Sequence, residues 1–278
     1  RFYKSALSSA FVESVICGPH TPEVSRELKD LVLDSLAAKP YPPTQHPAQK
    51  ALLLPTDSGP LAVRQKFSLA SNAAWLHIQP EDQTLESQVI LELLSRSVKP
   101  LFFEELRTNQ QTGYANHVFM RKDENVATLV FAVESSTHSP DELIARYELF
   151  LEEYLRKVET NLSPERFEVL RSTLIETYAE PPRNLVEMND QLSTMAFKYS
   201  ERFDLLNEKI EIAKNLTQPG LIAAAKQILG RDNHRRLAIL VEGDNSTDDL
   251  RYKVMKSPGH IQRSGLHTSF AEAQIFRP

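Results

Sequence analysis

The sequence predicts an α+β fold, in which helices pack on one face of a mainly antiparallel sheet. Short segments of alternating or continuous apolar residues, typical of strands, occur on both sides of residues 84–108 and again at residues 236–241. Longer segments whose apolar residues recur every three or four positions, typical of amphipathic helices, form a block between residues 139 and 229. Strands and helices that come in separate runs favour helices on one face of an antiparallel sheet.

Residues 1–38 are expected to be the C-terminal remnant of a preceding α+β domain. They contain a predicted strand at Phe11–Cys17 and a predicted helix that ends near Leu36. The chain begins with Arg1-Phe2-Tyr3-Lys4, without an initiator methionine or the apolar core of a signal peptide. We therefore expect it to be a piece of a longer polypeptide.

Residues 39–49 are predicted to be a proline-rich linker. Four prolines lie within residues 39–47, and such a segment neither continues a helix nor enters the interior of a sheet. Residues 50–243 are then expected to form a complete α+β domain, followed by a polar tail of uncertain order at residues 244–278.

The elements of the complete domain are predicted in the order β-β-β-α-α-β-β-α-α-α-α-β. Pro100 is expected to separate the first two helices. Ser139-Pro140-Asp141-Glu142 is a capping box with proline at the first helical position, which predicts the start of a helix. The predicted strands are Ala51–Leu54, Leu61–Phe67, Ala73–Ile78, Ala115–Met120, Val126–Val133 and Arg236–Val241. The predicted helices lie at residues 84–98, 101–108, 139–158, 163–180, 185–199 and 205–229, and the last is expected to be broken near residues 217–220.

The composition excludes several functional classes. With 41% hydrophobic and 25% charged residues, the chain has the composition of a soluble globular protein. Lysine and arginine are scattered and the formal net charge is −5, so no basic stripe for nucleic acid is expected. No apolar run is long enough to cross a bilayer, and the eight glycines form no phosphate loop. The sequence is compatible with a location in the cytoplasm or in the periplasm.

The segment Leu101–Tyr114 carries the residues with the clearest chemical meaning. A helix is predicted to end near Arg107, Gly113 to turn the chain and Tyr114 to begin a strand, which brings a guanidinium and a phenol to one junction. These donors suit a peptide carbonyl on which negative charge develops during hydrolysis. The same spacing also fits a structural role, because an arginine near a helix C-terminus interacts favourably with the helix dipole and a tyrosine can end a sheet edge.

The pattern Phe-x-x-Leu-Arg-Thr-x-x-Gln-x-Gly-Tyr at residues 103–114 resembles a signature in the C-terminal half of insulinase and pitrilysin family zinc metallopeptidases. The likeness extends over about residues 60–243 and includes Ser-Pro-Glu-x-Phe at the start of a long helix. In that family two halves, each of two α+β domains, close around a substrate chamber. The zinc lies in the N-terminal half, and the C-terminal half supplies an arginine and a tyrosine that contact the substrate. The resemblance implies these roles for Arg107 and Tyr114. Thr112 departs from the pattern, which more often has an aliphatic residue, so weaker local packing is expected.

No zinc site is expected in this chain. The family's His-x-x-Glu-His motif is absent from the sequence, although there are eight histidines. In the nearest approach, His20-Thr21-Pro22-Glu23, Val24 stands where the second histidine should be. The remaining histidines without a ligand pattern include His77, His117, His138 and His234.

Two glutamate pairs and one cysteine are interpreted as structural. Adjacent residues on a helix point in different directions, so Glu104-Glu105 and Glu152-Glu153 are expected to be solvated rather than an acid and base pair. Cys17, the single cysteine, follows two apolar residues and is expected to be a small core residue.

The expected function is that of an accessory C-terminal domain of a zinc metalloendopeptidase that degrades or processes peptides. This domain is expected to help close the substrate chamber, to contribute Arg107 and Tyr114, and not to cleave alone. Its expected partners are the N-terminal catalytic half of the same polypeptide and peptide substrates, with a homodimer possible; no nucleic acid, no membrane span and no cofactor is expected in this segment. The alternative is a catalytically inactive family member that acts as a structural or assembly subunit. The presence of both Arg107 and Tyr114 favours the peptidase.

Overall fold

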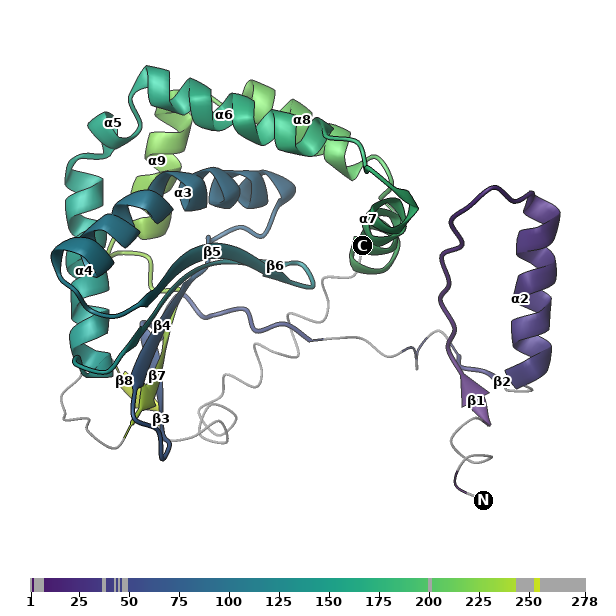
Figure 1. Ribbon diagram of the computed structural model, residues 1–278, viewed down its shortest axis with the longest axis horizontal. Coiled ribbons are helices and arrows are strands. Elements are labelled where there is room, and N and C mark those ends of the chain that lie inside the picture. Colours follow the sequence, from purple (N-terminus) through teal and green to yellow (C-terminus); the bar gives the residue numbers. More distant parts are fainter. Residues whose placement is uncertain are drawn as a thin grey trace. The chain divides into compact units, whose positions relative to one another are not determined.

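The computed structural model describes residues 2, 8–36, 39–42, 44, 46, 50–199 and 202–243, together with the backbone of residues 253–255. These residues fall into two compact units (Figure 1). One unit contains the described residues up to 46 together with residues 180–199 and 202–205, and the other contains residues 50–179 and those from 206 onward.

The first unit contains two short strands, β1 (Ser9–Ala10) and β2 (Lys39–Pro40), which pair in parallel, and two helices, α2 (Pro22–Leu36) and α7 (Leu185–Lys198). The N–H groups of Lys39 and Tyr41 donate to the carbonyls of Ser8 and Ala10, so the missing N–H of Pro40 falls between two ladder bonds. The predicted linker therefore begins in a strand.

The predicted strand at Phe11–Cys17 is wrong, because these residues have no regular secondary structure. A strand needs a partner, and β2 pairs with Ser9–Ala10 instead. The predicted helix is confirmed as α2, but no residue of it is buried within the part of the chain that the structure describes. Its apolar residues stay 40% to 62% exposed, namely Val24, Leu28, Leu31, Val32 and Leu33.

The second unit is built on a six-stranded sheet in the order β5-β6-β4-β7-β3-β8. Neighbours from β5 to β7 are antiparallel, whereas β3 runs parallel to β7 and to β8. The sheet is therefore mainly antiparallel, as predicted. Its strands are β3 (Leu61–Lys66), β4 (Asn72–Ile78), β5 (Ala115–Asp123), β6 (Val126–Ser135), β7 (Arg236–Glu242) and β8 (Lys253–Met255). Strand β8 belongs to the predicted tail at residues 244–278, and the rest of that tail lies outside the described residues.

The predicted strand at Ala51–Leu54 is also wrong. The side chain of Gln79 takes the place of a neighbouring strand: its Oε1 accepts from the Leu54 N–H and its Nε2 donates to the Leu52 carbonyl, both at 2.8 Å. A buried side-chain amide thus satisfies the backbone groups that a ladder would otherwise pair.

Helices cover one face of this sheet (Figure 1). Phe102 lies at the centre of the core, with its ring 5.3 Å from the rings of Phe131, Tyr147 and Phe150. The capping box at Ser139 is confirmed, with both reciprocal hydrogen bonds to Glu142. The helices are α3 (Leu85–Phe103), α4 (Pro140–Arg156), α5 (Val158–Asn161), α6 (Pro164–Ala179), α8 (Leu205–Asn215) and α9 (Gln218–Leu229).

Pro100 does not divide the helix as predicted. Helix α3 runs through it to Phe103 and continues directly into a π-helical turn, η2 (Glu104–Asn109). Pro100 is exposed, whereas Phe102 and Leu106 beyond it are fully buried. Burial of these two side chains keeps the chain helical, because it outweighs the loss of one backbone hydrogen bond at the proline.

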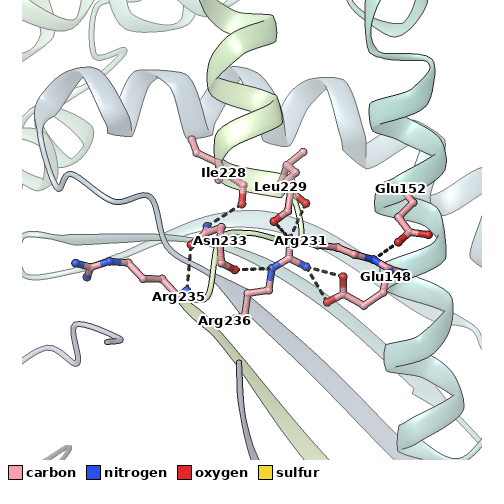
Figure 2. A network of polar contacts seen from close by, with 9 residues as sticks. Glu148, Glu152, Ile228, Leu229, Arg231, Asn233, Arg235 and Arg236 are labelled. Carbon is pink, nitrogen blue, oxygen red and sulfur yellow. Dashed lines mark hydrogen bonds and ion pairs between the residues drawn. The ribbon is translucent and has the colours of Figure 1, made fainter. Parts of the chain in front are cut away.

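A polar network joins the start of β7 to α4 and to the end of α9 (Figure 2). Arg236 is only 2% exposed, and its guanidinium donates to both carboxylate oxygens of Glu148 at 2.6 and 2.7 Å. It also donates to the carbonyls of Leu229 and Gly230 at 2.6 and 2.7 Å. These carbonyls lie at the end of a helix, where the helix itself supplies no donor, so Arg236 serves as a C-terminal cap together with the Asn233 N–H, which also donates to Gly230.

Candidate functional site

The candidate site begins at η2, where the helix widens. The N–H of Gln110 donates to the carbonyl of Glu105 at 2.9 Å, one residue further back than in an α-helix. The side chains of Asn109 and Gln110 donate to the Glu105 carboxylate at 2.9 and 2.8 Å. These hydrogen bonds, first from Gln110 and then from Asn109, lower the pKa of Glu105. The turn is therefore held by its own side chains.

The loop after η2 is closed by Thr112 and Gly113. Thr112 is fully buried, and both its N–H and its hydroxyl donate to the Leu106 carbonyl at 2.9 Å. Threonine fills less apolar volume here than an aliphatic residue such as leucine would. Its hydroxyl hydrogen bond to Leu106 offsets this loss of packing. A Cβ on Gly113 would lie 1.9 Å from the carbonyl oxygen of Glu134, so only glycine lets the loop approach β6 so closely. This closure places Tyr114 at the start of β5.

The structure brings Arg107 and Tyr114 together. The guanidinium carbon of Arg107 lies 4.4 Å from the centre of the Tyr114 ring and 4.9 Å from that of Phe103. Arg107 is half-buried, whereas Tyr114 is 84% exposed and Phe103 is 39% exposed. A cation thus stacks on two aromatic rings at an open surface.

The N–H groups of this guanidinium point to no protein acceptor among the residues that the structure describes, since neither a hydrogen bond nor an ion pair of Arg107 occurs there. The guanidinium carbon lies over both rings, and the N–H donors of a guanidinium lie in its own plane. The arrangement can therefore bind a carbonyl or carboxylate oxygen, with the Tyr114 hydroxyl as a further donor.

Phe103 is the member of this site to which sequence reasoning assigned no role. It begins the motif, and it lies four residues before Arg107, a spacing that places side chains on the same helix face. This four-residue spacing is the feature of the sequence from which the contact between Phe103 and Arg107 could have been predicted.

Three of the four paired glutamates bind other residues, and Glu104 is exposed. The carboxylate of Glu105 binds Asn109 and Gln110, that of Glu153 pairs with Arg156 and Lys157, and that of Glu152 with Arg231. An open hollow of about 430 Å³ between η2 and α4 contains Glu104, Glu105 and Glu153 in its lining. The charge of Glu153 opposes the lowering of the Glu105 pKa, but hydrogen bonds from Gln110 and Asn109 have the larger effect on Glu105.

The histidines do not gather around a metal position. Within the described ranges, no group of three or more His, Cys, Asp or Glu side chains is arranged to hold a metal ion. His77 is half-buried beside a small cavity of about 100 Å³, and its desolvation lowers its pKa to about 4, with a smaller contribution from Arg121. Cys17 is half-buried in the first unit, which differs from the expected core position.

No helix among the described residues is both long and apolar enough to cross a membrane.

The fold is that of an α+β domain with a half-buried arginine and an exposed tyrosine at a helix–strand junction. Residues 93–193 match the model of the PQQ synthase PqqF-like C-terminal lobe domain 4. The chain is 25% identical over 250 residues to a nardilysin-like protein of Arabidopsis thaliana and 24% identical over 245 residues to human insulin-degrading enzyme. These alignments cover 87% and 86% of the chain but only 24% of each relative, so the chain spans about a quarter of their length.

Solved structures share the fold. Pitrilysin superposes with a TM-score of 0.74 over 89% of this chain and 26% of its own, at 21% identity. A structure titled as a peptidase M16 inactive domain from Pseudomonas fluorescens superposes with a TM-score of 0.56 over 82% of this chain and 53% of its own, at 12% identity. The sequence matches and the shared fold make this chain similar to the C-terminal half of insulinase and pitrilysin family peptidases.

Proposed function

We propose that this chain is an accessory part of a zinc metalloendopeptidase, in which Arg107 and Tyr114 contact the substrate peptide near the scissile bond. The observation that carries the proposal is the stacked guanidinium, whose in-plane donors have no acceptor in the described protein and lie beside the exposed Tyr114 ring. Donors held in place before the reaction are effective at stabilising charge that develops on a substrate oxygen.

Each residue has a separate task in this proposal. Arg107 donates in-plane N–H bonds to the substrate carbonyl or to a neighbouring one, and the Tyr114 hydroxyl donates a further bond as negative charge develops. Zinc, which the family resemblance assigns to the N-terminal half, supplies Lewis-acid chemistry when bound there. The described residues of this chain fit no such metal, so this chain's part is to bind and orient the substrate.

The domain organisation belongs to the same proposal. Residues 1–38 would complete a preceding α+β domain, residues 39–49 connect it, and residues 50–243 form the C-terminal domain that helps to close the substrate chamber. The exposed apolar residues of α2 support this division, because a helix of a complete domain normally buries its apolar stripe. In this arrangement the partners are the N-terminal half of the same polypeptide and peptide substrates.

The second candidate is a catalytically inactive member of the family with a structural or assembly role. Two similar solved structures are titled as inactive domains, one from Pseudomonas fluorescens and one from Bordetella parapertussis. A scaffold has no need of an arginine with free donors beside an exposed tyrosine, and this pair favours the peptidase.

Substitutions in the full-length enzyme test the proposal. Tyr114→Phe keeps the ring and its stacking but removes the hydroxyl, and is expected to lower kcat by about 10²–10³ where one oxyanion donor is lost, or less where zinc polarises the same oxygen. Arg107→Lys keeps the charge but loses the planar donors, and is also expected to lower kcat. Both variants should melt at nearly the wild-type temperature.

The two candidates differ in these measurements. A structural role predicts a lowered melting temperature with nearly normal kcat per folded molecule. If either variant cleaved a short peptide at the wild-type rate, the substituted residue would have no catalytic role.

A further inference from the structure

Arg146 of α4 connects that helix to the end of η2. Its Nη1 donates to the Oε1 of Gln110 at 2.7 Å, and the two residues are 36 positions apart in the sequence. The Nε2 of the same amide donates to the Glu105 carboxylate at 2.8 Å. One side-chain amide therefore lies between a guanidinium and a carboxylate, and each of these charges strengthens the hydrogen bond that it makes.

The segment held by this link is the one that carries Arg107. The N–H of Gln110 also donates to the Glu105 carbonyl at 2.9 Å, so these two residues close the π-helical turn through main chain and side chains alike, with Arg107 between them. Such turns are rare, and they hold one residue more than an α-helical turn. A return to α-helical bonding would rotate Arg107 about the helix axis, away from its position over the rings of Phe103 and Tyr114.

The stability of α4 does not account for an arginine at position 146. The residue is half-buried, and its Nε is buried without a hydrogen-bond partner in the part of the chain that the structure describes. The carboxylate of Glu142, one turn earlier, accepts the Ser139 N–H of the capping box. A buried donor without a partner is destabilising, and an apolar side chain of similar length would avoid that cost. The arginine is better explained by the turn that it holds.

The other end of the loop has a separate support from β5. Asn116 is 6% exposed, and its Nδ2 donates to the Gly113 carbonyl at 2.7 Å. This hydrogen bond fixes the backbone that leads into Tyr114, whereas Arg146 acts on the turn that carries Arg107. The two side chains of the candidate site are therefore held by different contacts, which can be removed one at a time.

We propose that Arg146 is a positioning residue of the candidate site: through Gln110 it keeps η2 in the conformation that places Arg107 over the two rings, with its donors available to the substrate. This rests on the proposed function, because it takes Arg107 to contact the substrate. Misplacement of such a group by about 1 Å can lower turnover by about 10²-fold, even when the substitution lies far from the reacting atoms.

Hydrogen exchange of the full-length enzyme, measured without substrate, tests whether Arg146 holds the turn. Arg146→Met keeps a long side chain and removes every donor. Amides in the segment covering residues 105–112 are expected to exchange about fivefold faster in this variant, as expected for the loss of one hydrogen bond. Exchange in β6 should be unchanged.

Peptide hydrolysis by the same enzyme tests the consequence, with Arg166→Met as the matched control. Arg166 is also half-buried on a helix and donates to the Ser97 carbonyl in α3 at 3.2 Å, but it does not reach η2. Arg146→Met is expected to lower kcat by about 10-fold to 100-fold with KM nearly unchanged, whereas Arg166→Met should keep the wild-type kcat per folded molecule.

A second variant breaks the same link from its other end. Gln110→Met should reproduce the kcat of Arg146→Met, and the double variant should lose no more than either single one, because the two residues act as a unit. Gln110 is half-exposed, so this variant tests the proposal even if Arg146→Met does not fold.

The effect of Arg146 must pass through Arg107 if the proposal is correct. In an enzyme that already carries Arg107→Lys, the addition of Arg146→Met is therefore expected to change kcat by less than about twofold. Three results would overturn the proposal: unchanged exchange at residues 105–112, a loss of kcat no greater than that of Arg166→Met, or the same fold loss of kcat with and without Arg107→Lys.

These results differ from a failure of the proposed function. If Arg107→Lys loses turnover while Arg146→Met keeps wild-type turnover and exchange, the substrate contact stands and the positioning role alone falls. If Arg107→Lys keeps full turnover, the proposed function falls and the positioning role falls as well, even where Arg146→Met speeds exchange in the turn.

Discussion

Arg107 gains orientation rather than much stability from its two rings. Cation–π contacts at exposed sites contribute about 0.5–1 kcal/mol each, so the contacts with Phe103 and Tyr114 add little to the free energy of unfolding. They restrict a long, flexible side chain to one plane. A guanidinium that is already oriented loses less conformational entropy when it binds a carbonyl, which is the advantage expected of a substrate contact.

His77 of β4 is a half-buried titratable residue that lies outside the candidate site. Its Nε2 is buried without a hydrogen-bond partner in the described chain. The charged groups that act on it are Arg121, which lowers its pKa, and Asp123, which raises it. Both lie on β5, and burial contributes more than either.

The pKa of His77 predicts a pH dependence of stability. Its folded-state pKa of about 4 is below the ordinary value of 6.5, so the unfolded chain binds the proton more readily. The contribution of His77 is thus fully present above pH 6.5 and is lost as the pH falls from 6.5 towards 4. We expect this loss to reach at most about 3 kcal/mol.

The check is to compare the unfolding free energies of wild type and His77→Gln across this range. The wild type should become relatively less stable as the pH falls. A constant difference between the two proteins would contradict the prediction.

At the scale of elements, the C-terminal end of α9 is fixed to the sheet by charge as well as by apolar packing. Arg236 lies in β7, yet it satisfies the last carbonyls of α9 and the carboxylate of Glu148 in α4 (Figure 2). Arg231, two residues beyond the end of α9, pairs with Glu152 at a much more exposed position. The two ion pairs connect the same elements but differ in burial.

This difference in burial predicts unequal costs of substitution. Arg236→Leu removes the guanidinium that binds the largely buried Glu148 carboxylate and the Leu229 carbonyl, and is expected to lower the free energy of unfolding by about 3–5 kcal/mol. Arg231→Ala removes an exposed pair and should cost less than about 1 kcal/mol. Denaturant unfolding of both variants provides the measurement, and similar costs would contradict the role assigned to burial.

At the scale of the whole molecule, the two units differ in how much apolar surface they bury. The second unit encloses one continuous core beneath its sheet, whereas α2 in the first unit has no buried residue. Apolar residues in such a stripe normally pack against another element. The difference agrees with the proposal that residues 1–38 belong to a domain whose other elements lie elsewhere in a longer polypeptide.

Hydrogen exchange of the isolated chain can test this proposal. Amides of α2 are expected to exchange close to the rate of an unprotected helix, while those of β4 and β6 exchange only by opening of the core. In the full-length enzyme the α2 amides should become protected. Equal protection of α2 and the central strands in a demonstrated monomer would count against the remnant interpretation.

The elements that depend mainly on neighbouring residues, through capping or apolar periodicity, were predictable from the sequence. The capping box at Ser139 predicted the start of α4, and apolar periodicity predicted α2 and the central strands. The motif also predicted that Arg107 and Tyr114 would meet at one junction. The loop between these two residues is short, so the end of the helix and the start of the strand must lie close together. The predicted functions of these two residues await the substitutions described above.

The sequence by itself determined the fold class, the principal helices and strands of the second unit and the two residues of the candidate site, because capping, periodicity and turn residues act over a few neighbours. Only the tertiary structure decided which apolar segments became strands: Phe11–Cys17 lacks a partner and Ala51–Leu54 is bound by Gln79. It likewise decided that α3 continues through Pro100 and that β5 is an edge. Each of these features depends on contacts with residues that are distant in the sequence. Local sequence patterns do not predict such burial or strand pairing.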